Sequence, residues 1–246
     1  MENSQNISER PAPGIAMSIQ AHPDDQDFTI AATLAKWAKQ GTRIISVMIT
    51  HGEAGTNEKD WTPQKSVELA TIREQEQRAA NRVLGIQETV FLDYPDGVLQ
   101  PTMELRRDLT RIIRRYKPDV VLTGDPTTRF FGNDYMNHPD HRAAADAACD
   151  AVFPSAVSRP IFPELLAEGL EPHQVKAVYL HGSTTPNEWV DVQDTIQMKI
   201  EALRQHHSQL NGWDPGEELR SWAAEAGAPK GLACAESFRV MVLSTD

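Results

Sequence analysis

Two short clusters of histidine and aspartate, far apart in the chain, contain the residues most suited to chemistry. The first, 22–25 (His-Pro-Asp-Asp), follows an apolar run, and the second, 138–141 (His-Pro-Asp-His), precedes an alanine-rich helical pattern. Imidazole and carboxylate groups are the ligands that zinc and similar borderline metals prefer. Both clusters lie at corners that lead into a helix, where an open α/β sheet gathers its ligands. We therefore expect the two corners to meet at one metal centre.

The spacing within each cluster supports this interpretation. His22 and Asp25 are three residues apart, so they can face one point on an opening helical turn, and Asp24 between them stays free. A metal lowers the pKa of its bound water to about 7, and a free carboxylate can take the proton. His138 and His141 repeat the spacing. One of these imidazoles would complete a three-ligand site with an open position, and the other could stabilise an oxyanion or the leaving amine.

Each of these residues also has a structural explanation when it is taken singly. Asp24, Asp25 and Asp27 would serve as helix caps or as partners of the helix dipole. A lone histidine is more often a satisfied surface or core residue than a ligand. Asp140 belongs to the metal-centre interpretation, in which it fixes the tautomer of a neighbouring histidine. The presence of two such clusters at comparable corners favours the metal centre.

The composition limits the classes of function. The 246 residues are 40% hydrophobic, which suffices for the core of one α/β domain. A net charge of −11 disfavours binding to nucleic acid or to anionic lipid. Cys149 and Cys234 lack a metal-type spacing and fit a reduced, cytoplasmic setting. We see no signal peptide, and no apolar run near the roughly 20 residues that a membrane span needs.

Short β-branched runs alternate with longer stretches of helical period, a pattern typical of βαβ units around a parallel sheet. Strands are predicted over 15–21, 43–50, 89–92, 119–123, 177–180 and 238–243, and helices over 30–38, 64–84, 105–116, 141–152 and 192–203. This predicts a Rossmann-like three-layer α/β fold with a mostly parallel sheet, helices on both faces and the active site at the C-terminal edge of the sheet. Residues 1–13 are expected to form a flexible tail, and residues 14–246 a single domain.

Motifs along nearly the whole chain make it resemble the LmbE/PIG-L family of zinc-dependent de-N-acetylases. This family includes N-acetylglucosaminylphosphatidylinositol deacetylase and the deacetylases of thiol-sugar biosynthesis. Besides the two corners, the similarity rests on Thr50 to Gly55 (THGEAG), Arg73-Glu74, Leu84-Gly85, Asp96-Gly97, Lys199, Ala202-Leu203, His206 to Gln209 (HHSQ) and Ala235 to Phe238 (AESF). The resemblance implies a hydrolase that removes the acetyl group from an N-acetylated amino sugar or glycoconjugate of the N-acetylglucosaminyl type.

The family pattern assigns the zinc ligands to His22, Asp25 and His141. It implies one Zn²⁺ per chain, although the same nitrogen and oxygen ligands also accept Fe²⁺. By the same pattern Asp24 is the general base that activates the attacking water. His138 stabilises the oxyanion and helps the amine to leave, and Asp140 orients it.

Four further residues are candidates for substrate contact. By the family pattern Arg73 and Asp96 contact the acetyl group or the sugar; the alternatives are an ion pair of Arg73 with Glu76 and a turn role for Asp96. His51, which ends the second predicted strand, points to the same sheet edge. Arg129 lies in an aromatic-rich loop, residues 125–137, that leads into the second corner. A packed loop is the alternative there. Segment 211–233, with two tryptophans, would form a flap over the site.

The remaining positions carry weaker signals. The family usually has glutamate where this chain has Gln26, a change expected to affect the surroundings of the metal but not the reaction class. His206 and His207 end a predicted helix, where a positive charge is favoured for structural reasons. His173 and His181 carry no clear signal.

Other functions stay open at this point. One is a zinc amidohydrolase acting on a non-sugar N-acyl substrate. Another is a metal-binding regulatory homologue without catalysis, which Gln26 favours slightly and the retained Asp24 and His138 oppose. A dinucleotide-dependent dehydrogenase is disfavoured, because no glycine-rich turn follows the first strand. The expected partner is a small N-acetylated sugar, and a homo-oligomer is compatible with the sequence.

Overall fold

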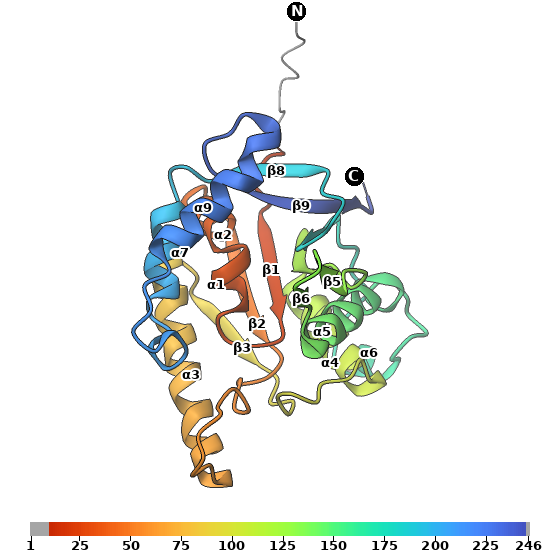
Figure 1. Cartoon of the computed structure of the whole chain (residues 1–246). Coiled ribbons are helices and arrows are strands. Elements are labelled where there is room, and N and C mark those ends of the chain that lie inside the picture. Colours follow the sequence, from red (N-terminus) through yellow and green to blue (C-terminus); the bar gives the residue numbers. More distant parts are fainter. Residues whose placement is uncertain (1–9, 245–246) are drawn as a thin grey trace, which may run out of the picture.

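The computed structural model describes residues 10–244, so most of the predicted tail lies outside the described residues (Figure 1). Its strands are β1 (Ile15–Gln20), β2 (Arg43–Met48), β3 (Glu88–Phe91), β4 (Val120–Gly124), β5 (Phe130–Phe131), β6 (Tyr135–Met136), β7 (Ala177–His181), β8 (Glu188–Asp191) and β9 (Ala235–Val242). The α-helices are α1 (Asp25–Thr29), α2 (Ala31–Lys39), α3 (Pro63–Leu84), α4 (Met103–Tyr116), α5 (Pro139–Asp150), α6 (Glu164–Ala167), α7 (Ile196–Leu203), α8 (His207–Leu210) and α9 (Gly216–Gly227). A π-helical turn, η1 (Ala151–Ser155), and a 3₁₀ turn, η2 (Ala228–Lys230), complete them.

Seven strands form the central sheet in the order β3-β2-β1-β4-β7-β9-β8. The strands from β3 to β7 are parallel, and β9 runs antiparallel to β7 and to β8. The chain leaves β1 towards β2 on one side, and β4 lies on the other side. The C-terminal ends of β1 and β4 therefore meet where the strand order reverses, which is the usual ligand position in such sheets. The predicted, mostly parallel sheet is confirmed.

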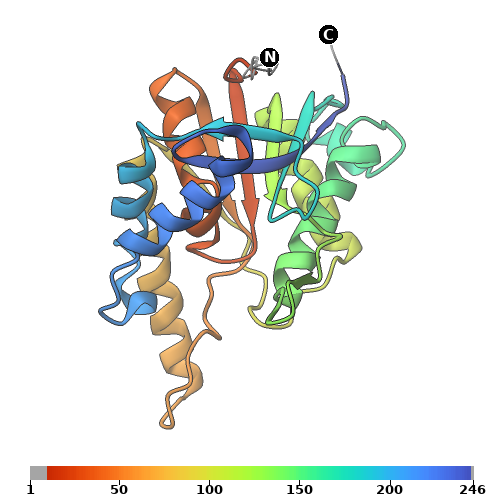
Figure 2. The same ribbon diagram turned by 45° about the horizontal axis from the view of Figure 1, so that its top comes forward.

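Helices cover both faces of the sheet (Figure 2). On one face, apolar side chains of α4 and α5 such as Leu109 and Ala147 pack against the sheet, and on the other face Leu34 of α2 and Leu84 of α3 do so. The interior strand β2 is buried from Ile44 onward, as expected for a strand with both faces covered. This arrangement confirms the three-layer fold.

Three elements differ from the sequence-based expectation. Segment 211–233 contains α9, whose Leu219 and Ala223 pack against Ile200 of α7, so most of it belongs to the fold and is not a flap. Glycine and proline at both ends of α9 obscured its helical period. Strand β8 and the hairpin β5–β6 are only four and two residues long per strand, too short for a periodic signal.

Within residues 10–244, we find no helix with the length and apolar character needed to cross a membrane.

A buried ion pair fixes the helices that follow the first corner. Lys199 Nζ of α7 donates to Glu236 Oε1 of β9 over 2.7 Å and to the carbonyl of Thr29 over 2.8 Å. Glu236 also accepts the backbone N–H groups of Ala32 and Thr33 at the start of α2, which has no side-chain cap of its own. The pair therefore joins three elements at the junction of α1 and α2.

Replacing Glu236 by alanine should lower the free energy of unfolding by about 3–5 kcal/mol, because the charge of Lys199 is then buried without a partner. Urea denaturation measures the change. The control is Glu58→Ala, since Glu58 is 62% exposed in its pair with Lys65 and its loss should leave stability close to that of the parent. Equal stability of the two variants would contradict this role for Glu236.

Candidate metal centre

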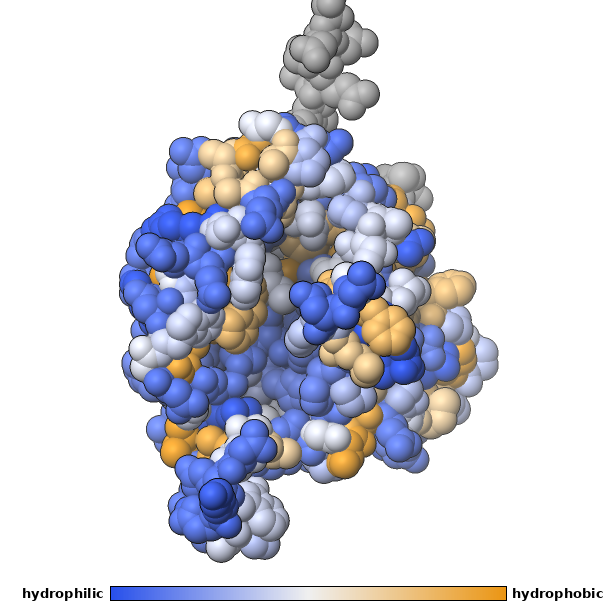
Figure 3. Space-filling model, viewed as in Figure 1, coloured by the Kyte–Doolittle hydropathy of each residue, from blue (hydrophilic) through white to orange (hydrophobic). Residues whose placement is uncertain are grey.

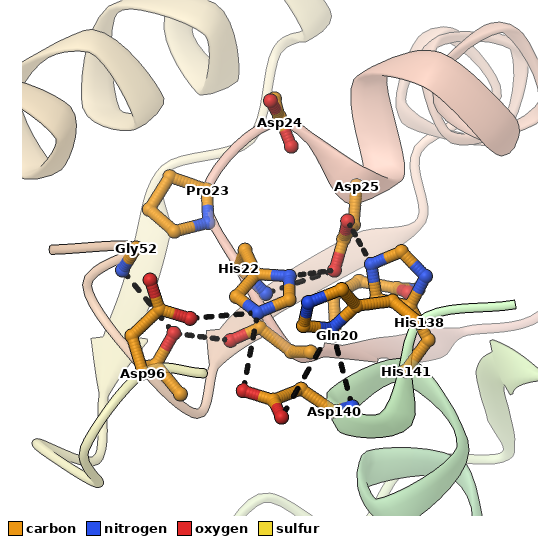
Figure 4. Close-up of polar contacts among 12 residues, drawn as sticks. Gln20, His22, Pro23, Asp24, Asp25, Gly52, Asp96, His138, Asp140 and His141 are labelled. Carbon is orange, nitrogen blue, oxygen red and sulfur yellow. Dashed lines mark hydrogen bonds and ion pairs between the residues drawn. The ribbon is translucent and has the colours of Figure 1, made fainter. Parts of the chain in front are cut away.

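An unusual backbone turn at the first corner separates two adjacent carboxylates. Asp24 has a left-handed conformation with φ of 89°, which typically costs about 1–3 kcal/mol for a non-glycine residue and concentrates at functional sites. Its N–H donates to Gln77 Oε1 over 2.8 Å, and its carbonyl accepts the N–H groups of Asp27 and Phe28, which start α1. As a result, Asp25 points towards the histidines while Asp24 points away from them (Figure 4).

The two corners meet in space, as the sequence predicted. The ring centroids of His22, His138 and His141 lie 5.1–5.3 Å from one another. Asp25 lies between two of these rings: its Oδ1 is 3.0 Å from His141 Nε2, and its Oδ2 is 3.4 Å from His22 Nδ1. The carboxylate of Asp25 thus contacts one nitrogen of each of two imidazoles, through a different oxygen in each case.

The opposite nitrogens of the same two histidines face oxygen acceptors. His22 Nε2 lies 2.9 Å from Asp96 Oδ1 and 3.4 Å from Asp140 Oδ2, and His141 Nδ1 lies 3.2 Å from Asn137 Oδ1. Metal-binding histidines almost always donate their second N–H to such an oxygen, which leaves the other nitrogen free to ligate. This arrangement keeps His22, Asp25 and His141 as candidate ligands of a divalent cation. Among the described residues, donor atoms that all lie within 4.8 Å of one another are found in the sets His22-His138-His141 and His22-Asp96-Asp140.

His138 is held differently from the other two histidines. Its Nδ1 accepts the backbone N–H of Asp140 over 3.2 Å and so caps α5. Because Nδ1 is an acceptor there, the proton of the neutral ring is on Nε2. Burial, together with the neighbouring His22 and His141, lowers the pKa of His138 and favours this neutral form.

Asp140 has a different main partner from the one that the family pattern implied. Its carboxylate accepts the N–H groups of Gly97 and Leu99 over 2.7 and 3.2 Å and faces His22 Nε2, whereas it is 4.0 Å from His138 Nδ1. It therefore orients His22 with its carboxylate and His138 only through its backbone. Its position agrees with the general expectation that it fixes a histidine tautomer.

Electrostatics distinguish the two neighbouring aspartates. Burial raises the pKa of Asp24 to about 7, and the charge of Asp25 acts in the same direction. Burial also disfavours the charge of Asp25, but His141 and His22 outweigh it and hold the pKa of Asp25 well below its usual value. Asp25 is thus a permanent anion, as a metal ligand must be, and Asp24 is poised to exchange a proton near neutral pH.

The surroundings of His22 favour a positive charge at this point. Burial alone would lower the pKa of His22, yet the carboxylates of Asp25, Asp140 and Asp96 raise it to about 12. The same carboxylates would stabilise a metal cation, which agrees with the choice of donor atoms.

Two cavities adjoin the centre, and the molecular surface is hollowed near the middle of the face shown in Figure 3. A polar cavity of about 400 Å³ is lined by Asp24, His138, Arg73 and Asp96 among others. The other, of about 430 Å³, is mostly apolar and lies against the hairpin β5–β6. Asp25 and His141 line both cavities, so the metal centre lies between them.

Of the four predicted substrate contacts, Arg73 and Asp96 line the polar cavity. The guanidinium of Arg73 is buried against Gly52 and Gly55, where a Cβ atom on either glycine would come within 2.5 Å of it. The alternative ion pair with Glu76 does not form, because both carboxylate oxygens of Glu76 bond to Ser208.

His51 and Arg129 line neither cavity. His51 Nε2 is 2.6 Å from Asp93 Oδ1, and its ring stacks on Phe91. Arg129 is exposed, and its carbonyl accepts the N–H of Asn137. Both have structural partners away from the centre.

Two histidines that the sequence did not single out lie close to the centre. His181, at the end of β7, lines the apolar cavity, and its Nε2 is 3.0 Å from Gln20 Oε1. His206 is fully buried, with its Nε2 3.0 Å from Asp27 Oδ2, and thus belongs to the support of the first corner rather than to a solvated helix end. His206 belongs to the HHSQ motif on which the family resemblance rests, whereas His181 carried no clear signal in the sequence.

Gln26, which replaces the glutamate usual in the family, lies away from the proposed metal ligands. Gln26 is fully buried, accepts a hydrogen bond from Ser46 Oγ over 2.9 Å and donates to Asn81 Oδ1 over 2.6 Å. It therefore links α1 to β2 and α3 without contact to the metal ligands.

Comparison with known proteins agrees with the family resemblance that the sequence motifs indicate. The pattern of the family PIG-L: GlcNAc-PI de-N-acetylase matches residues 17–152. Diacetylchitobiose deacetylase of Thermococcus kodakarensis is 32% identical over 91% of this chain and 81% of its own length. The 1D-myo-inositol 2-acetamido-2-deoxy-alpha-D-glucopyranoside deacetylase of Actinosynnema mirum is 28% identical over 88% of each chain. The crystal structure of N,N'-diacetylchitobiose deacetylase from Pyrococcus horikoshii superposes with a TM-score of 0.83 at 32% identity, covering 94% of this chain and 84% of that one.

Substituting Gln26 by glutamate should lower the free energy of unfolding by about 1–3 kcal/mol, since a carboxylate cannot donate to Asn81 Oδ1. The metal content should stay at the parent level, because Gln26 touches no ligand. Urea denaturation and elemental analysis give the two readouts. A variant of unchanged stability with altered metal content would show instead that Gln26 acts on the metal.

Proposed function

This chain belongs to the PIG-L family of de-N-acetylases, and we propose that its metal centre hydrolyses the acetamide of an N-acetylated amino sugar or glycoconjugate with Zn²⁺ as cofactor. The observation that carries the proposal is the pairing of a free carboxylate, Asp24, with an imidazole, His138, in one cavity that Asp25 and its partners His22 and His141 also line. That pairing supports catalysis over a purely metal-binding role.

His22, Asp25 and His141 would hold the metal. Zinc bound there supplies a Lewis acid, which polarises the amide carbonyl and acidifies water. Asp24 accepts the proton of the attacking water. His138 donates a hydrogen bond from Nε2 to the oxygen that becomes negative.

The geometry also suggests how the amine leaves. Because His138 Nδ1 accepts a backbone N–H, the ring has no second proton to give away without losing that bond. Asp24, with a pKa near 7, can return the proton that it took from water to the departing nitrogen. The products are acetate and a free amino sugar.

The polar cavity suits the sugar half of the substrate. Arg73 and Asp96 provide a donor and an acceptor there, and Arg73 Nε is buried without a hydrogen-bond partner among the described residues. We propose these two as contacts for the hydroxyl groups. We also propose the cytoplasmic setting that the sequence indicates from its cysteine usage.

Asp24→Asn should reduce kcat for acetate release from an N-acetylglucosaminide by roughly 10²- to 10⁴-fold, because asparagine cannot accept the proton. Asparagine also tolerates the left-handed backbone, so the turn is kept. Zinc content should remain at one per chain. Asp93→Asn is the control, since the Asp93 side chain is 83% exposed and outside the cavities. Parent-level turnover in Asp24→Asn would refute the base assignment.

Metal analysis of two variants tests the ligand set. Asp25→Asn should lose most of its zinc, whereas His138→Ala should keep the zinc and lose turnover. The reverse result would assign the metal to the three histidines His22, His138 and His141.

A further inference from the structure

The apolar cavity beside the metal centre has no part in the chemistry described so far. Its walls are aromatic: Phe131 of β5 and Tyr135 of β6 lie 5.8 Å apart between ring centroids, and Phe28 of α1 stacks on Trp213 at 6.4 Å. The hairpin β5–β6 lies beside α5, next to the end of β1 (Figure 1). The cavity is thus built from side chains that surround the second and first corners.

The position of the proton-transferring residues locates the amide of the substrate. Asp24 and His138 line only the polar cavity, whereas Asp25 and His141 line both. An amide within reach of all four must lie at the boundary between the two cavities. In an N-acyl amino sugar, the sugar and the acyl group are attached to opposite ends of that amide, so each cavity is available to one of them.

The hydrogen bonds in the wall of the apolar cavity indicate which half of the substrate binds there. Several polar groups of the apolar cavity are engaged within the protein: Asp125 Oδ1 accepts from Thr127, His181 from β7 pairs with Gln20, and Thr29 Oγ1 donates to the carbonyl of Asp25. Sugar hydroxyls buried there would lose partners that water supplies, at a cost in free energy. An alkyl chain needs no such partners.

The size of the cavity exceeds what an acetyl group requires. A methyl group takes about the space of one water molecule, roughly 30 Å³, and this cavity measures about 430 Å³. Its volume is within the 300–1,000 Å³ range typical of cavities that bury a ligand of drug size. An acetyl methyl would therefore leave most of the apolar wall without contact.

We propose that the apolar cavity binds the acyl group of the substrate, and that besides acetamides the enzyme hydrolyses amino sugars whose N-acyl chains are longer than acetyl. The proposal rests on the proposed function, because it places the amide between Asp24 and the metal ligands. Phe131 and Gly124, which line this cavity and not the polar one, form the surface that contacts the chain, together with Phe28 and Tyr135, which line both.

The test compares N-acetyl-, N-butyryl- and N-hexanoyl-glucosaminides with one common aglycone, using the zinc-loaded full chain and measuring release of the free amine. We expect kcat/KM to rise with chain length by up to about fourfold per methylene, the factor that corresponds to burial of one CH₂ group. A hexanoyl-to-acetyl ratio of kcat/KM below one would overturn the proposal. Absence of hydrolysis with all three substrates would instead refute the proposed function.

A matched pair of variants on the hairpin tests the location. Phe131→Ala should lower the hexanoyl-to-acetyl ratio about tenfold, because it removes one wall of the cavity. Phe130→Ala should leave the ratio unchanged, since Phe130 is 57% exposed and does not line the cavity. Equal ratios in the two variants would overturn the location.

A second substitution fills the cavity from its inner end. A Cβ at Gly124 meets Ala145, His181 and the carbonyl of His141 at 3.7, 3.8 and 3.9 Å, ordinary contact distances, so the Cβ of Gly124→Val fits without a clash. It should lower the hexanoyl-to-acetyl ratio by at least tenfold. An unchanged ratio in Gly124→Val would contradict an acyl chain at this position.

The rival occupant is a second sugar ring stacked on the aromatic walls. Comparing N,N'-diacetylchitobiose with a monosaccharide glycoside in the parent and in Phe131→Ala distinguishes it. If the variant lowers the disaccharide-to-monosaccharide ratio while the hexanoyl-to-acetyl ratio is kept, the cavity binds a sugar and the acyl proposal is wrong.

Discussion

The carboxylate of Asp25, held between two imidazoles, is the interaction on which the site depends. A buried carboxylate is unfavourable unless hydrogen-bond donors or cations surround it. The carboxylate of Asp25 is surrounded by the imidazole of His22, the backbone N–H of His22 and the imidazole of His141. His22 follows β1, and His141 follows the loop after β4. These strands are adjacent and parallel, so their C-terminal ends open at the same edge of the sheet and allow the contact.

The proposed role of Asp24 as a base depends on a backbone turn that directs its side chain away from the proposed ligands. The left-handed turn is held by Gln77 of α3, whose side-chain amide also donates to Asp27. Asp27 in turn contacts His206 from the segment after α7. Residues from two distant parts of the chain, Gln77 and His206, thus support one strained backbone position that separates the proposed metal ligand from the proposed proton acceptor.

Local patterns made much of the fold predictable. The continuous apolar run of β2 and the 3.6-residue period of α4 follow from simple burial rules, and the structure has both elements within two residues of the expected bounds. Helix α9 and strand β8 were missed, because their stability comes from packing against α7 and pairing with β9 rather than from a strong pattern of their own. His181 was missed for the same reason: its relevance depends on the cavity that it faces.

The sequence by itself determined the donor types, their three-residue spacing within each corner and, through the family motifs, the class of reaction. Tertiary structure decided which nitrogen of each imidazole faces Asp25, that Asp140 serves His22 more than His138, and that a polar and an apolar cavity lie on either side of the centre. The physical reason is the range of the interactions. Spacing along one helical turn is local, whereas tautomers, partners and cavities depend on contacts between segments brought together by strand order and side-chain packing.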